Sequence, residues 1–443
     1  MRNVQKWSWV VAVAGFLFGF DTVVISGANE PIRELWNTSP WFHGTFIMSM
    51  ALWGTVLGSL FGGKPLDAWG RKPTLFWIGV LYTISAVGSA MAWDPFSFSF
   101  FRFLGGIGVG ASSVAAPAYI SEISGAKSRG RLVALYQFNI VFGILIAFLS
   151  NYFLAGVGGG LDWRLMLGVE ALPAIIYTIM VMTVPESPRW LAVKKGDSQA
   201  AKKVLQDLFE TKEEADYTLK AIQADAAATA SKPPVPLFSR KFRFPLMLAF
   251  LLAMFNQLSG INFILYYAPS ILENAGFAGK DSLLSSVSLG GINLLFTFVG
   301  LYFIDRLGRK QLMYIGSLGY VFSLSMVAFA FYSHAAPLFT LTFILLFIAS
   351  HAMGQGAVIW VFISEIFPNS VRGSGQSWGT GTHWVFAAMI TLLGPVVQDA
   401  FPEGWPIFAF FALCMVFQLA FTHWIMPETK GKSLEELQTE LER

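Results

Sequence analysis

Charged residues are scarce in this sequence of 443 residues. Asp, Glu, Lys and Arg account for 13% of the chain and hydrophobic residues for 55%, whereas a soluble domain carries about 25% charged residues. A globular core of this size cannot enclose so much apolar surface. The composition therefore excludes a soluble enzyme and indicates a chain embedded in a lipid bilayer.

Cysteine and catalytic motifs are equally rare. The single cysteine, Cys414, excludes an intramolecular disulfide, and its apolar surroundings indicate a small packed hydrophobic residue. The sequence has no metal-ligand spacing, no nucleophile elbow and no phosphate-binding loop before a helix, and its five histidines form no motif. We therefore expect no enzymatic activity, no metal and no organic cofactor.

Apolar segments of about 20 residues, the length that crosses a bilayer as a helix, are abundant. The twelve segments have approximate centres at Gly19, Trp53, Leu81, Gly110, Phe142, Pro173, Met254, Leu294, Val321, Leu346, Phe386 and Leu413. This pattern predicts an all-α membrane protein with twelve transmembrane helices.

Lysine and arginine indicate the orientation of these helices. If both termini are cytoplasmic, only Arg33, Arg164 and Lys280 fall in outside loops, and Arg102 falls within a helix. Because inside loops are enriched in Lys and Arg, this asymmetry predicts cytoplasmic termini. The short loops and the single cysteine favour a bacterial inner membrane.

Three motifs occur twice. DAWGRK from Asp67 returns as DRLGRK from Asp305, 238 residues later, and PES from Pro185 returns as PET from Pro427, 242 residues later. A Ser-Glu pair followed by Arg-Gly also recurs, with an offset of 243 residues. Such a parallel duplication predicts two halves that rock around a site at the bilayer midplane. We expect an N-terminal half at 1–185, a cytoplasmic helical linker at 186–241, a C-terminal half at 242–427 and a cytoplasmic tail at 428–443.

Seven runs follow one another along the chain: GFLFGFDTVVISGA, DAWGRK, RGRL, PESPRW, NQLSGIN, SEIFPNSVRG and PETKG. In their order and spacing they resemble the sugar porter family of the major facilitator superfamily, which includes bacterial proton–sugar symporters and mammalian facilitative glucose transporters. The resemblance implies two pseudo-symmetric six-helix halves and transport of a monosaccharide by alternating access.

The repeated charge motifs fall at the predicted cytoplasmic ends of helices. Glu122 and Arg129 are seven residues apart, which is two turns of one continuous helix, and Glu365 and Arg372 repeat this spacing. We interpret the motifs as an ion-pair gate that stabilises the outward-open state and breaks as the inside opens. Positive-inside topology with helix capping is the alternative. The predicted gate comprises Asp67, Arg71, Glu122, Arg129, Asp305, Arg309, Glu365 and Arg372.

Three charged residues, Asp21, Arg102 and Glu170, fall within predicted spans, where a charge costs about 2.5–3.5 kcal/mol on insertion scales. All three map to the outer half of the membrane in the N-terminal half. A carboxylate that alternates between pairing with arginine and holding a proton can couple transport to a proton. The resemblance assigns this role to the matching residues of bacterial symporters, whereas facilitative glucose transporters lack the acid at position 21. We predict Asp21 as the protonation site, Arg102 as its switch and Glu170 as a modulator; a static ion pair is the alternative.

A monosaccharide needs amides that donate and accept hydrogen bonds, and an aromatic surface for its ring face. The family's polar sugar contacts correspond to Gln137, Gln257, Asn262 and Asn293, and its ring-packing tryptophans to Trp360 and Trp384. Asn256 and His383 are further candidates. The family has Gln at the position of Asn256 and Gln or Asn at the position of His383, so the resemblance does not identify the sugar. For any single amide, a hydrogen bond between helices is the alternative.

Tyr266 and Tyr267 match the family's extracellular gate, with ordinary aromatic packing as the alternative. The sequence therefore predicts a monomeric secondary transporter that imports a hexose or pentose with a proton as coupling ion, and no nucleic-acid partner. A passive uniporter is the main competing function, and Asp21 separates the two. A membrane sugar sensor is disfavoured by the short tail after Pro427.

Overall fold

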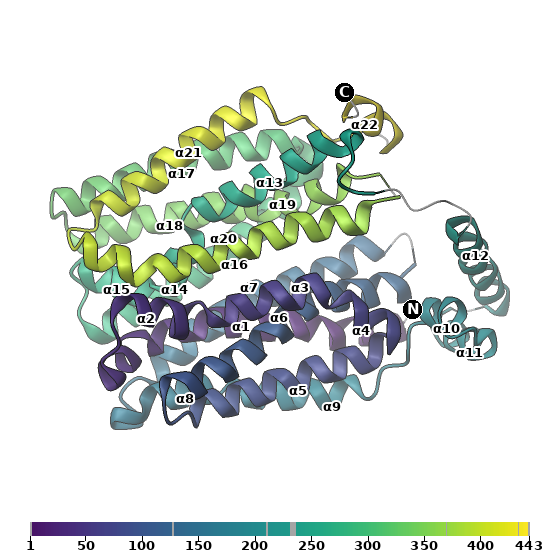
Figure 1. Ribbon diagram of the computed structural model, residues 1–443, viewed down its shortest axis with the longest axis horizontal. Coiled ribbons are helices and arrows are strands. Elements are labelled where there is room, and N and C mark those ends of the chain that lie inside the picture. The colour runs from purple at the N-terminus through teal and green to yellow at the C-terminus, as the bar shows by residue number, and fades with distance from the viewer. Residues whose placement is uncertain are drawn as a thin grey trace.

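The structure is a computed structural model that describes residues 2–125, 128–209, 211–230, 236–368, 370–432 and 434–441. All regular secondary structure in these residues is helical. The helices form two bundles that lie side by side, one from each half of the sequence (Figure 1).

The first bundle comprises α1 (Arg2–Trp36), α2 (Pro40–Phe42), η1 (His43–Met48), α3 (Met50–Phe61), α4 (Gly63–Ala68), α5 (Arg71–Ala90), α6 (Pro95–Ile123), α7 (Arg129–Leu154), η2 (Gly159–Leu161), α8 (Asp162–Gly168) and α9 (Ala171–Val181). Three short helices follow in the linker, namely α10 (Pro188–Val193), α11 (Ser198–Leu208) and α12 (Lys212–Ala230).

The second bundle begins with η3 (Arg240–Phe242) and continues with α13 (Arg243–Leu258), α14 (Ile261–Tyr266), α15 (Ala268–Asn274), α16 (Gly279–Leu307), α17 (Arg309–Tyr332), α18 (Pro337–Met353), α19 (Gln355–Glu365), α20 (Arg372–Ala400) and α21 (Trp405–Trp424). The short helix α22 (Leu434–Leu441) ends the described chain.

The linker helices lie at the same end of the two bundles as both chain termini (Figure 1). We call this the linker end, and the opposite end, where α1 leads into α2, the far end. An even number of crossings in each half explains why the termini and the linker share one end.

The number of long apolar helices agrees with the sequence pattern. Eleven helices within the described residues are long and apolar enough to cross a membrane, and the bent pair Pro40–Met48 with Met50–Ala68 makes twelve if it forms one span. Large apolar side chains such as Phe322 and Phe417 are more than half exposed on these helices. In a membrane such side chains face lipid instead of water.

The two bundles differ in the continuity of their helices. In the first bundle, α1 and α6 each run unbroken through their full length. In the second bundle, the chain breaks between α13 and α14 at Gly260, whose φ of +84° lies in the left-handed region, and between α18 and α19 at Gly354. Gly260 can adopt this conformation without strain because it has no Cβ.

Within the first bundle, α3 and α6 approach so closely that backbone meets backbone. A Cβ added to Gly106 would lie 1.8 Å from the carbonyl oxygen of Ala51, and one added to Gly110 would lie 2.3 Å from that of Thr55. Small residues at such crossings allow the close packing that holds membrane helices together.

We predict that Gly106→Ala lowers the apparent melting temperature of the purified protein by several degrees, because the helices must separate at a cost of about 1–3 kcal/mol. The buried Cys414 provides the measurement, since a thiol-reactive dye labels it as the protein unfolds. Gly291→Ala, within α16 and with open space at its Cβ position, is the matched control and should melt like the wild type. Equal melting of the two variants would contradict the packing argument.

Candidate functional site

A buried ion pair joins α1 to α6. The Arg102 guanidinium pairs with the carboxylate of Asp21, and its Nη2 also donates to the Asp21 backbone carbonyl at 3.0 Å. Both side chains are only 2% exposed. The two residues that the sequence placed at similar depth are thus in direct contact.

Glu170, between α8 and α9, adds a second carboxylate to this pair. It is 1% exposed and interacts electrostatically with both Asp21 and Arg102. Its Oε1 has no hydrogen-bond partner among the described residues. With both carboxylates ionised the cluster carries one net negative charge, and one bound proton makes it neutral. A single proton is therefore the smallest change that removes an uncompensated charge from this buried place.

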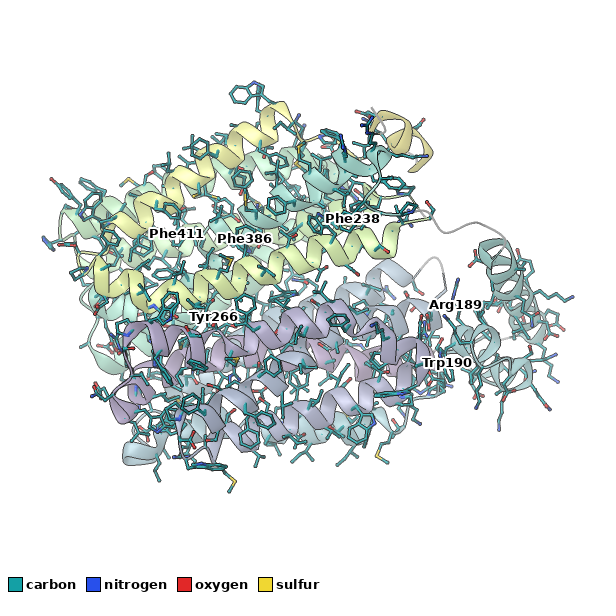
Figure 2. All side chains as sticks on the ribbon, in the orientation of Figure 1. Arg189, Trp190, Phe238, Tyr266, Phe386 and Phe411 are labelled. Carbon is teal, nitrogen blue, oxygen red and sulfur yellow. The ribbon has the colours of Figure 1, made fainter. Side chains whose placement is uncertain are left out.

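Tyr266 of the second bundle lies on α14, which packs against α1, the helix that carries Asp21. Its side chain is buried. Figure 2 shows Tyr266 at the boundary between the two bundles. The neighbouring Tyr267 is also fully buried, and its hydroxyl donates to the Thr391 carbonyl at 2.6 Å. The broken span of the second half therefore packs, through α14, against the helix that carries Asp21.

The second bundle holds a cluster of amides and aromatic rings. Nε2 of Gln257 donates to Oδ1 of Asn256 at 2.9 Å and lies 3.2 Å from Nε2 of His383. The His383 ring packs between two indoles, with its centroid 4.9 Å from that of Trp360 and 4.8 Å from that of Trp384. Five of the eight sugar-site candidates thus form one connected group.

Several polar atoms of this region have no partner within the described chain. They are Oε1 of Gln257, Nδ2 of Asn262 and Nε1 of Trp384. One is an acceptor and two are donors, which is the mixture that a ring of hydroxyl groups satisfies. Trp360, in contrast, is 36% exposed, so its indole offers an accessible apolar face.

The remaining candidates lie on other helices. Asn262 lies in the first turn of α14, beyond the break at Gly260, so it and Gln257 do not share one helix. Gln137 lies on α7 and Asn293 on α16, two helices that pack against each other across the two bundles. No hydrogen bond or ring contact within the described residues joins Gln137 or Asn293 to the Gln257 cluster. Phe18 connects this cluster with α1, since its ring lies 5.6 Å from that of Trp384.

Polar contacts between the two bundles gather at the far end. Ser270 on α15 accepts a hydrogen bond from Asn29 at 3.2 Å and donates one to Glu30 at 3.1 Å. Arg33 on α1 lies 3.8 Å from Asp399 on α20. Among the described residues of the two bundles, these are the side-chain hydrogen bonds and ion pairs that cross from one half to the other. We call this group the far-end seam.

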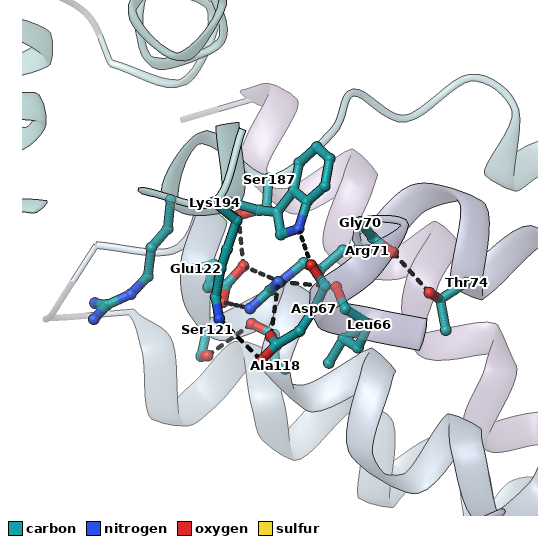
Figure 3. Close-up of polar contacts among 12 residues, drawn as sticks. Leu66, Asp67, Gly70, Arg71, Thr74, Ala118, Ser121, Glu122, Ser187 and Lys194 are labelled. Carbon is teal, nitrogen blue, oxygen red and sulfur yellow. Dashed lines mark hydrogen bonds and ion pairs between the residues drawn. The ribbon is translucent and has the colours of Figure 1, made fainter. Parts of the chain in front are cut away.

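At the linker end, each half has its own charge cluster. In the first half, Nε and Nη2 of Arg71 donate to the two carboxylate oxygens of Glu122 at 2.9 and 2.8 Å. Figure 3 shows this bidentate pair, with Asp67 on the other side of the guanidinium at 3.5 Å. Lys194 of the linker lies 3.2 Å from Asp67. The linker helices are thus tied to the first bundle by charge.

The second half repeats this geometry. Arg309 contacts the Glu365 carboxylate at 2.7 and 3.2 Å and Asp305 at 3.2 Å. The repeat extends to the PES and PET motifs: Glu186 accepts the Arg71 backbone N–H at 2.9 Å, and Glu428 accepts that of Arg309 at 3.0 Å. Burial raises the pKa of the Glu186 carboxyl, against the opposing effect of these N–H donors.

One expectation about these charges is wrong. Glu122 and Arg129 do not share a helix, because α6 ends at Ile123 and α7 begins at Arg129. Glu365 likewise ends α19, and Arg372 begins α20 after a turn that contains Pro368, which cannot continue the backbone hydrogen bonds of a helix. The Arg129 side chain lies outside the described part of the chain.

Arg372 also lacks the expected pairing with Glu365. Its Nε lies 3.4 Å from the Phe367 carbonyl, and its buried Nη2 has no partner among the described residues. Its guanidinium thus keeps one unsatisfied donor within the described chain.

Sequence reasoning missed three groups of residues. The far-end seam has no motif of its own. The roles of Glu186 and Glu428 could have been inferred from the sequence, because the motifs that contain them recur at nearly the same offset as the other repeats. The contact between Tyr320 and His351, 2.6 Å from Oη to Nδ1, joins two helices and leaves no local pattern in the sequence.

Comparison with known proteins agrees with this geometry. Residues 7–441 match the family model described as sugar (and other) transporter. The chain is 35% identical to a glucose transport protein of Synechocystis, over 99% of this chain and 97% of that protein. It is 32% identical to the D-xylose-proton symporter of Escherichia coli, over 97% and 94%, and 31% identical to the glucose facilitated diffusion protein of Zymomonas mobilis, over 98% and 97%.

Solved structures show the same fold. The inward-open xylose transporter of Escherichia coli superposes with a TM-score of 0.87 at 31% identity, covering 99% of this chain and 100% of that one. The same transporter bound to 6-bromo-6-deoxy-D-glucose gives a TM-score of 0.81 at 30% identity, covering 99% of each chain. The predicted all-α membrane fold and the family resemblance are both confirmed. The chain belongs to the sugar porter family of the major facilitator superfamily and is a multi-pass membrane protein.

Proposed function

We propose that this protein imports a monosaccharide, a hexose or a pentose, together with a proton, by alternating access. The observation that carries the proposal is the coexistence of two buried and incompletely satisfied sites. The Asp21–Arg102–Glu170 cluster lies in the first half, and the Gln257–His383–tryptophan cluster lies in the second. Phe18, on the same helix as Asp21, contacts Trp384 of the second site.

The sugar site rests on chemistry and on relatives. Gln257, Asn262 and Trp384 present polar atoms that have no partner in the described chain, beside the indole of Trp360. No charged side chain belongs to this cluster among the described residues, which favours a neutral ligand. The relatives are named for glucose and xylose. Gln137 and Asn293, on the paired helices α7 and α16, complete the proposed site from across the two halves.

Proton coupling rests on the charge cluster. An ion pair that only joined α1 to α6 would need one carboxylate, whereas this cluster has two for one arginine. If Arg102 moves away from Asp21 during transport, the unpaired carboxylate becomes a strong proton acceptor in a low-dielectric place. The competing function is passive facilitation, which the similarity to the Zymomonas protein favours.

We infer that the linker end is cytoplasmic, because the basic residues of the linker and of both charge motifs lie there. The far-end seam then closes the outer side. When the linker end closes instead, Arg372 gains a carboxylate partner across the two halves, and the clusters around Arg71 and Arg309 move as rigid units. In this mechanism the ion pairs inside each half persist, and those between the halves alternate.

For proton coupling, we expect Asp21→Asn in proteoliposomes to abolish sugar-driven proton uptake and to reduce sugar accumulation to about the equilibrium ratio, because the side chain can no longer gain and lose a proton. Counterflow exchange of radiolabelled D-glucose should continue at a reduced rate. Asp281→Asn, at an exposed carboxylate on α16, is the control and should keep both activities. Equal, pH-independent uptake by wild type and Asp21→Asn would instead favour a passive facilitator.

For the sugar site, we expect Gln257→Ala to raise the apparent KM about tenfold or more, as the loss of one or two ligand hydrogen bonds implies. Uptake is measured with D-glucose, D-galactose, D-xylose, L-arabinose and myo-inositol, which also identifies the substrate. Gln223→Ala, in the exposed linker helix α12, should leave KM unchanged. An unchanged KM for Gln257→Ala would place the sugar elsewhere.

For the gate, we expect Arg372→Gln to reduce the fraction of outward-open protein. The readout is labelling of Ser270→Cys from outside with an impermeant maleimide, which should slow about three- to tenfold when an ion pair of roughly 1 kcal/mol is lost. Arg306→Gln is the control, because within the described residues that guanidinium stacks on Tyr302 at 3.9 Å and forms no ion pair. The gate assignment fails if both variants are labelled at the rate of the parent.

A further inference from the structure

Ser85, on α5, has a buried hydroxyl that makes no hydrogen bond to any described residue. A serine or threonine inside a helix commonly donates to the carbonyl four residues earlier. Thr83 on the same helix does so, since its hydroxyl donates to the Gly79 carbonyl at 2.9 Å. The Ser85 hydroxyl makes no such bond, although an unpartnered polar group is costly in the membrane interior.

The Ser85 hydroxyl lies close to the Asp21 carboxylate, with Gly105 of α6 beside both. A Cβ added to Gly105 would lie 2.3 Å from Oγ of Ser85 and 3.7 Å from Oδ1 of Asp21. Both oxygens thus border the same point next to α6. Any larger residue at position 105 would displace the serine hydroxyl, because protein interiors leave no room for such an overlap.

Arg102 pairs with this same carboxylate oxygen, Oδ1 of Asp21. While the arginine is in place, the carboxylate is ionised and has a partner. When the arginine withdraws, a proton on Asp21 creates an O–H group that needs an acceptor in a place without water. A guanidinium has donors only, whereas the Ser85 hydroxyl accepts as well as donates. Its own hydrogen then has the Leu81 carbonyl, four residues earlier, as its usual acceptor.

The internal repeat contains an equivalent serine in a different environment. Ser323 lies 238 residues after Ser85, the offset that separates the Asp67 and Asp305 motifs, and it is also buried. Its hydroxyl donates to the Gly319 carbonyl of its own helix, α17, at 2.6 Å. Of these two serines, the one beside the charge cluster is the one without a bond to its own helix.

We propose that Ser85 is the hydrogen-bond partner of protonated Asp21 and thereby sets the pH at which the carrier takes up its proton. The Asp21 O–H donates to Oγ of Ser85 once Arg102 has withdrawn. The bond is lost when the proton leaves and the ion pair with Arg102 forms again. Asp21 thus exchanges a charged partner for a neutral one. This inference rests on the proposed proton coupling.

Other titratable groups surround α1. Away from the linker end, those buried on the elements packed against it include Arg102 on α6, Glu170 between α8 and α9, His43 on η1, Tyr82 on α5, Tyr136 on α7, Tyr177 on α9 and Tyr266 on α14. Arginine and tyrosine ordinarily keep their charge between about pH 5 and pH 8. The His43 ring contacts Thr38 and Asn29. Glu170 is the competing acceptor, and a proton shared between the two carboxylates would leave Ser85 without a role.

The central test is Ser85→Ala, measured as uptake of radiolabelled D-glucose, with D-xylose as a second probe, into proteoliposomes at equal pH on both sides. The pH of half-maximal uptake should fall by about 0.5–1 unit, a requirement for about three- to tenfold more protons, the effect of one net hydrogen bond. KM for the sugar at saturating proton concentration should not change. Ser323→Ala is the matched control and should keep the half-maximal pH of the wild type.

Moving the hydroxyl to the opposite helix provides an independent test if Ser85→Ala does not fold. In Ser85→Gly/Gly105→Ser, the space that the serine leaves admits a Cβ at position 105, which lies 3.7 Å from Oδ1 of Asp21. The new hydroxyl is then within reach of the carboxylate, so this variant should recover most of the wild-type half-maximal pH. Ser85→Gly/Gly105→Ala has the same packing without the hydroxyl and should be shifted as Ser85→Ala is.

The outcomes separate this inference from the proposed function. If wild-type uptake depends on pH and Asp21→Asn removes that dependence, an unchanged half-maximal pH in Ser85→Ala overturns the role of Ser85 and leaves proton coupling in place. A shift toward higher pH overturns it too, because the serine would then favour the ionised carboxylate. Equal values for the two double variants have the same meaning. If wild-type uptake does not depend on pH, both proposals fail.

Discussion

The interior of a bilayer contains no water to satisfy polar groups, so each buried donor, acceptor or charge in this protein needs a partner within the chain. Helices satisfy the backbone, and Ser and Thr hydroxyls mostly donate to the preceding helical turn. Two exceptions bear on function: in the first half, one carboxylate beyond what Arg102 can neutralise, and in the second, the amide and indole atoms of Gln257, Asn262 and Trp384 that have no partner in the described chain. The need to satisfy every buried polar group therefore also indicates the sites at which a bound proton or sugar would supply the missing partner.

The two halves share a framework and divide the tasks. Both use an arginine held bidentately by a glutamate, with a second glutamate from the PES or PET motif on the backbone of the same turn. In the first half α1 and α6 are continuous, and charge is buried between them. The second half interrupts two spans and gathers amides beside the breaks. The duplicated sequence gives both halves the same scaffold. Different residues at a few interior positions give the first half a charged site and the second half a polar, uncharged one.

The helices, their number and the repeat follow from patterns that are local in the sequence: apolar length, the Lys and Arg bias, and motifs at fixed offsets. The sequence also places Asp21, Arg102 and Glu170 at similar depths in the membrane, because the topology gives the position of a residue along its span. Contacts that depend on how separate helices rotate against each other were not accessible. Asn29 with Ser270, and Tyr320 with His351, belong to this class. The sequence also does not show that helices end close to Glu122 and Glu365, because a spacing of seven residues between Glu and Arg fits a continuous helix as well as two helices joined by a turn.

The far-end seam has a consequence for the kinetics of the empty carrier. Among the described residues, the side-chain polar contacts between the halves lie at the far end only. Outward opening of the unloaded protein would break these contacts. Closing the linker end would add few new ones until Arg372 gains a partner. Under the proposed orientation and alternating access, the energy profile of the unloaded cycle would then favour the inward-facing form. Reorientation without cargo would be the slow step of net uptake, and a sugar on the inside that loads the returning carrier would accelerate it.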